Sequence, residues 1–147
     1  MKIIKSKNIR TILKNNWPNL KFIWPTDSQY IVMDFDELKD VVKKCSVRGF
    51  SSDGELWDCD NYALQLHAKV QSHQYKLNKQ KNLKMKNSWA FGECIGLNNN
   101  ESLFQMGNPP HAINIAITNN GIALIEPKDD SVWVAGKNEM SLFFVKF

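Results

Sequence analysis

The stretch HAINIAITNNGIALIEP, residues 111–127, decides the expected fold. Two apolar, β-branched runs flank the tripeptide Asn119-Asn120-Gly121. Runs of this kind around an Asn-Gly pair are typical of an antiparallel β-hairpin, because Asn and Gly tolerate the backbone of a tight turn. The sequence therefore predicts a hairpin, with His111 opening its first strand and Glu126 near the end of its second.

The length of the hairpin loop sets which side chains share a face. Side chains alternate along a strand, so His111 lies on the face of Ile113. A two-residue Asn119-Asn120 loop places Glu126 opposite Ile113 and diagonal to His111, within reach of a side chain. A turn shifted by one residue moves Glu126 one pair further away, and a three-residue loop puts it on the face of Asn114. The sequence leaves open whether Glu126 or Asn114 orients His111.

The rest of the chain divides into helical patterns followed by strand patterns. Apolar residues recur at helical spacing in KNIRTILKNN (7–16), DFDELKDVVKKC (34–45) and DCDNYALQLHAKV (58–70). Further strands are predicted by SWAFGECIG (88–96), SVWVAG (131–136) and SLFFVKF (141–147). We therefore expect an α+β fold in which N-terminal helices pack on a C-terminal antiparallel β-meander.

The bulk composition is that of an ordinary globular chain. The 147 residues are 43% hydrophobic and 23% charged, with a formal net charge of +4, which indicates one domain over 1–147 and no dedicated nucleic-acid binder. No apolar run reaches the length of a membrane helix, and the first residues lack the apolar core of a secretory signal. Three widely spaced cysteines argue against a disulfide framework. We expect a cytoplasmic protein, in the host cytoplasm if a phage encodes it.

Cys59 lies in WDCDNYAL (57–64), at the expected start of a helix. A helix N-terminus carries partial positive charge, which favours a thiolate. Asp58 and Asp60 flank the cysteine, and nearby negative charge opposes a thiolate. If Cys59 is a nucleophile, these carboxylates are expected to cap the backbone or to bind a cation. Without further context, Cys59 is more typical of a packing cysteine.

A thiol nucleophile needs a base and a group that orients the base. His67 follows the cysteine by eight residues on the same helix, about 12 Å along its axis, which is too far. His73 falls at the polar end of that helix or in the loop beyond it. His111, at a strand end, is the candidate base, and Glu126 or Asn114 is the candidate orienting group.

Three motifs in chain order carry a resemblance. DCDNYA at 58–63, HAIN at 111–114 and LIEP at 124–127 resemble segments of the papain-like cysteine peptidases. They are most similar to the C-terminal protease domain of the fungal chimerolectins (mushroom agglutinins) and to related stand-alone phage domains. The resemblance spans roughly residues 30–133. It implies a papain-like fold and a catalytic triad of Cys59, His111 and Glu126.

The resemblance implies a function and a cofactor. Cys59 would attack a carbonyl and His111 would take its proton, in a thiol-dependent hydrolase that cleaves peptide or amide bonds of a protein or peptide substrate. The calcium dependence of the family would place a cation at Asp58 and Asp60. The sequence lacks a lectin trefoil, so carbohydrate binding is not expected, and it lacks a Gln shortly before Cys59 as an oxyanion donor.

Two alternatives to the hydrolase remain open. One is a catalytically inert, phage-type accessory or anti-defence protein that keeps the fold for binding. The other is a transglutaminase-like acyl transferase, which uses the same three residue types. Neither a nucleic acid nor a membrane is expected as a partner, and the oligomeric state is left open.

Overall fold

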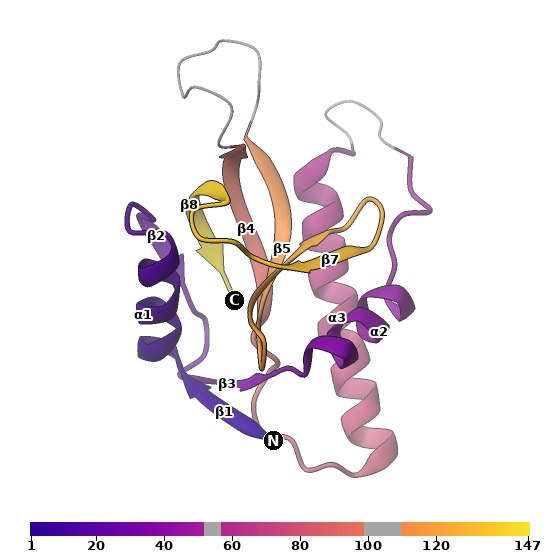
Figure 1. Ribbon diagram of the computed structural model, residues 1–147. Coiled ribbons are helices and arrows are strands. Elements are labelled where there is room, and N and C mark those ends of the chain that lie inside the picture. The colour runs from indigo at the N-terminus through magenta and orange to yellow at the C-terminus, as the bar shows by residue number, and fades with distance from the viewer. Residues whose placement is uncertain (52–56, 99–109) are drawn as a thin grey trace.

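The computed structural model describes residues 1–51, 57–98 and 110–147 (Figure 1). The first half contains β1 (Lys2–Lys5), α1 (Ser6–Asn16), β2 (Phe22–Trp24), β3 (Gln29–Val32), α2 (Phe35–Lys44) and α3 (Cys59–Lys81). The second half contains β4 (Phe91–Asn98), β5 (His111–Thr118), β6 (Gly121–Glu126), β7 (Ser131–Val134) and β8 (Met140–Lys146). No helix among the described residues has the length and apolarity to span a membrane.

Six strands form the main sheet, in the order β2-β8-β4-β5-β6-β7. Neighbouring strands are antiparallel except β2 and β8, which are parallel. β4, β5 and β8 run side by side in the middle of the molecule (Figure 1). β1 and β3 form a separate two-stranded ribbon.

Each face of the sheet carries its own core. Ile113, Ile115 and Ile117 of β5 are buried with residues of α1, whereas Ala116 between them is buried with residues of α2 and α3. The alternation of a strand thus divides β5 between two cores. α1 and α3 accordingly lie on opposite sides of the sheet (Figure 1).

The hairpin of β5 and β6 has a two-residue loop, which is one of the alternatives that the sequence left open. Thr118 pairs with Gly121 and Asn114 pairs with Ile125, so the loop is Asn119-Asn120. Gly121 has a φ of 112°, a conformation that glycine adopts without steric cost. This register places Glu126 opposite Ile113, on the face of the hairpin that also carries His111.

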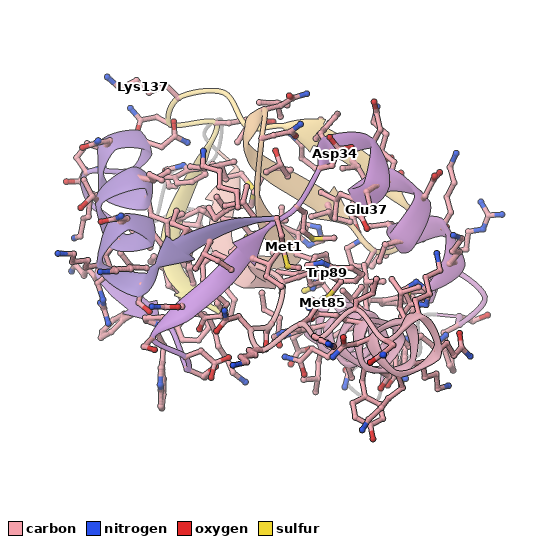
Figure 2. All side chains as sticks on the ribbon, turned by 90° about the horizontal axis from the view of Figure 1, so that it is seen from below. Met1, Asp34, Glu37, Met85, Trp89 and Lys137 are labelled. Carbon is pink, nitrogen blue, oxygen red and sulfur yellow. The ribbon has the colours of Figure 1, made fainter. Side chains whose placement is uncertain are left out.

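α2 begins at a capping aspartate. Asp34 caps α2, its carboxylate accepting from the backbone N–H groups of Asp36 and Glu37. Figure 2 shows Asp34 at the start of α2. Asn119 in the hairpin turn also donates to Asp34, at 2.7 Å, and so joins α2 to the sheet. α3 continues to Lys81, so that the first part of the lysine-rich stretch at 76–86 is helical.

The predicted papain-like α+β arrangement is wrong. The chain does not place its helices first and a meander of strands after them: three strands lie among the helices of the first half. β2 joins the sheet in parallel beside β8, and β8 lies between β2 and β4, so the sheet is mixed and dominates the fold. Strands of three or four residues with distant partners leave almost no local pattern, which is why the sequence did not reveal them.

Candidate functional site: a thiol beside a histidine–glutamate pair

Cys59 occupies the first position of α3, as the sequence predicted. Asp58 is the N-cap and forms a capping box with Asn61, whose Oδ1 accepts from the backbone N–H of Asp58 at 3.1 Å. The carboxylate of Asp58 thus caps the backbone. Capping was one of the two roles expected for it, the other being to bind a cation. Cys59 itself is half-buried and its thiol is free.

The sulfur of Cys59 lies against the start of β5. The backbone N–H of Ala112 donates to Sγ at 3.5 Å, and Sγ lies 3.9 Å from the carbonyl oxygen of Pro110. The residue between these two contacts is His111. The sulfur therefore lies at the N-terminus of α3, beside a backbone donor of β5.

His111 and Glu126 form a hydrogen-bonded pair. His111 Nε2 and Glu126 Oε2 are 2.6 Å apart, with side chains 39% and 21% exposed. The other carboxylate oxygen, Oε1, accepts from the backbone N–H of Lys128 at 3.1 Å, which fixes the orientation of the carboxylate. Both side chains are partly exposed to solvent, and the carboxylate holds the imidazole by a hydrogen bond.

The geometry decides between Glu126 and Asn114 as the partner of His111. Asn114 is fully buried, and its Nδ2 donates to the carbonyl oxygens of Ala63 at 2.8 Å and Gly92 at 3.0 Å. It therefore joins α3 to the sheet beneath the site and makes no contact with the imidazole in the described part of the chain. Among the described residues, Glu126 is the hydrogen-bond partner of the His111 ring.

Aromatic side chains line the approach to α3. Phe50 and Trp57 stack with ring centroids 4.5 Å apart, and Trp57 meets the edge of Tyr62 at 5.8 Å. The ammonium of Lys128 lies 5.6 Å from the Tyr62 ring. Trp57 lies close to Cys59 in the sequence, whereas Phe50 and Lys128 carried no sequence signal because the fold alone brings them here.

The remaining histidines lie elsewhere, as expected. His67 is buried, with Nδ1 2.7 Å from Glu93 Oε1 and Nε2 3.0 Å from Gln71 Nε2. His73 packs on Trp89, with centroids 6.3 Å apart. His67 thus joins α3 to β4, and His73 joins α3 to the residues just before β4. Neither is the histidine next to the sulfur of Cys59.

The described residues do not form a calcium shell. Among them, no group of three or more His, Cys, Asp or Glu side chains is placed to hold a metal ion. Calcium takes about six to eight oxygen ligands, whereas Asp58 is occupied as a cap and Asp60 is an exposed residue of the first helical turn. Asp58 and Asp60 as metal ligands stay a prediction.

The other two cysteines differ from Cys59 in burial. Burial raises the pKa of the Cys94 thiol far above its ordinary value, and the neighbouring Glu93 carboxylate raises it further. Burial also raises the pKa of Cys45, against the opposing effect of Lys69 and Lys44. Both thiols are therefore held neutral, and Cys59 is the accessible one.

Comparison with known proteins gives a fold relationship. One solved structure, named PSL1a-E64 complex, matches 99% of this chain with a TM-score of 0.71 and 18% identity. A second, the Polyporus squamosus lectin bound to the human-type influenza-binding epitope Neu5Aca2-6Galb1-4GlcNAc, matches 99% with a TM-score of 0.73 and 17% identity. The chain spans about half the length of each, 51% and 49%. No family model and no curated protein matches.

These findings correct four of the sequence-based predictions. The matching structures are named for a lectin and for a complex with E64, and neither name contains a peptidase. The resemblance to papain-like cysteine peptidases, the papain-like fold, the thiol hydrolase function and the description as a cysteine protease with a catalytic triad are contradicted. Three short motifs in order matched a pattern of residue types, and at this length such a pattern does not identify a family.

Proposed function

We propose that Cys59 is a nucleophilic thiol that forms covalent bonds with electrophilic groups, with His111 as proton acceptor and Glu126 as the residue that orients it. The observation that carries the proposal is the placement of the Cys59 sulfur against the backbone on both sides of His111. The His111–Glu126 pair at 2.6 Å supplies the proton acceptor.

The partner that we propose is a protein or peptide that bears the electrophile. The stacked Phe50 and Trp57 offer an apolar wall, and Lys128 adds a positive charge over Tyr62. Such a wall suits an extended chain with an apolar side chain. A cytoplasmic location is part of the proposal, since all three cysteines are free thiols.

Alkylation by iodoacetamide tests the thiol directly. The sulfur–carbon bond forms, the carbon–iodine bond breaks and iodide leaves, while the thiol proton passes to the imidazole. We expect peptide mapping to show Cys59 labelled and Cys45 and Cys94 unlabelled in the native protein. His111→Ala is expected to slow labelling about a hundredfold.

The controls separate activation from exposure. His73→Ala removes a half-buried histidine on the same helix as Cys59 and should leave the rate unchanged. Glu126→Gln should slow labelling less than His111→Ala does, because the amide keeps a hydrogen bond to the ring. E64, named with one matching structure, serves as a second probe. Equal labelling rates in the wild type and His111→Ala would contradict the proposal.

A second candidate function is glycan binding. Two observations favour it: a matching structure is named as a lectin with a bound sialylated trisaccharide, and this chain exposes two large aromatic side chains, Phe22 and Trp24, on one strand. Titration with Neu5Aca2-6Galb1-4GlcNAc, followed by amide chemical shifts, should give saturable changes. A spectrum that stays unchanged at millimolar glycan would rule this function out.

A further inference from the structure

A groove on the side of the molecule that carries α1 is separate from the thiol site. It has a volume of about 410 Å³ and is lined by Arg10, Lys21, Phe22, Ile23, Trp24 and Phe144. We propose that this groove binds an anionic sugar, with the sugar ring on Trp24 and its carboxylate or sulfate at Arg10 and Lys21. The proposal rests on the glycan-binding function above and assigns its site and ligand class.

The aromatic part of the groove follows from the position of β2. β2 is an edge strand, and its middle residue Ile23 turns into the core. Phe22 and Trp24 therefore point away from it and are 63% and 64% exposed. An exposed aromatic face at a groove is a surface on which the apolar C–H face of a sugar ring can stack.

The charge of the groove comes from the first 26 residues. They contain Lys2, Lys5, Lys7, Arg10, Lys14 and Lys21 and no acidic residue. Within the described ranges, neither Arg10 nor Lys21 forms an ion pair. Lys7 and Lys14 lie three and four residues from Arg10 on the same helix and share its face. Two unpaired cations in a positive field favour an anionic ligand.

The size of the groove favours a saccharide over a nucleic-acid strand. About 410 Å³ falls in the range of small-ligand pockets. A single strand of nucleic acid instead follows a longer basic channel with successive stacking platforms. A compact ligand that combines one ring with one anionic group matches both the aromatic residues and the cations.

The experiment compares two glycans and matched variants by titration at low and high salt. The full chain is titrated with Neu5Aca2-6Galb1-4GlcNAc and with Galb1-4GlcNAc, which lacks the carboxylate. We expect at least about tenfold tighter binding of the sialylated glycan, lost in high salt. Trp24→Ala and Arg10→Gln should each weaken binding about tenfold or more. Tyr75→Ala and Lys79→Gln, an exposed aromatic and a cation on α3, should bind like the wild type.

The outcomes separate the site from the function. If the wild type binds the sialylated glycan and Trp24→Ala and Arg10→Gln bind it equally well, the groove is the wrong site while glycan binding stands. If the wild type binds neither glycan, the glycan-binding function is refuted, and so is the assignment of the groove. Binding of a single-stranded oligonucleotide that Trp24→Ala abolishes, without glycan binding, would overturn the ligand class. Circular dichroism confirms that each variant is folded.

Discussion

At the scale of single residues, Gly92 lies where the backbones of β4 and β8 approach each other closely. A Cβ at this position would lie 1.9 Å from the backbone carbonyl oxygen of Lys146, an atom that cannot move without breaking the sheet. We expect Gly92→Ala to lower the free energy of unfolding by about 3 kcal/mol, measured by urea denaturation. Gly49→Ala is the control, because nothing lies within 4 Å of its Cβ position. Equal stability of the two variants would show that β4 and β8 are not packed so closely.

Asn114 supplies a second residue-scale test. Its Nδ2 faces two carbonyl oxygens in a fully buried position. Asn114→Asp replaces this donor by a carboxylate, and we expect a loss of about 3 kcal/mol or more at pH 7. Because the neutral acid can donate, the folded pKa of the new carboxyl lies above its unfolded value. The loss should therefore shrink as the pH falls toward about 4, measured as the stability difference from the wild type. A loss that does not depend on pH would contradict this account.

Residue chemistry could be predicted where a local pattern set the geometry. Cys59 at a helix start followed from helix signals, whereas the sequence left open which aspartate caps the helix and whether Glu126 or Asn114 pairs with His111. The role of Asn114 could not be predicted, because its partners come from α3 and β4 and depend on how these elements pack.

At the scale of elements, α2 is held by the cap at Asp34. The backbone N–H of Glu37 lowers the pKa of this carboxyl, with smaller contributions from Asp36 and Asn119 and an opposing effect of desolvation. A depressed folded pKa means that the stabilisation is present above the unfolded pKa and is lost as the pH falls through the folded value, below about 4. We expect Asp34→Ala to lower the Tm at neutral pH and to match the wild type in strong acid, measured by thermal scans. Asp36→Ala is the control, and a Tm difference that persists in acid would refute the charge argument.

The elements differ in how far the sequence could predict them. The helices at 6–16, 35–44 and from Cys59 carried apolar residues at helical spacing, the last two also begin at aspartates, and the hairpin carried its own turn. β1, β2 and β3 were missed, because a strand of three or four residues is stabilised by a partner far away in the sequence. The alternation around buried Ile23, with Phe22 and Trp24 outside, was the one local sign of β2.

At the scale of the whole molecule, two cores share one sheet. Ile115 is buried in the core on the α1 side, and Leu66 in the core on the α3 side. If the predicted single domain is correct, Ile115→Ala and Leu66→Ala should each lower the stability of one common unfolding transition by about 3 kcal/mol. Leu64→Ala, exposed on the same helix as Leu66, should change it little. Two transitions with separate midpoints would show that the cores unfold independently.

The family of the whole molecule was the least predictable property. Residue types at Cys59, His111 and Glu126 suggested a peptidase, while the matching solved structures are named for a lectin and for a complex with E64. The chain shares its fold with these structures, but at 17–18% identity it has few residues in common with them. The chemistry proposed for the thiol and for the groove therefore rests on the contacts of this chain.

The parallel pairing of β2 and β8 has a consequence for how the chain folds during synthesis. Thr26, just beyond β2, donates its hydroxyl to the carbonyl oxygen of Phe147, 121 residues later. Phe147 in turn donates its backbone N–H to Trp24. Residues 22–24 therefore leave the ribosome long before the strand they pair with has been made. Closing so long a loop is entropically costly, so β2 is expected to join the sheet in one of the last steps of folding.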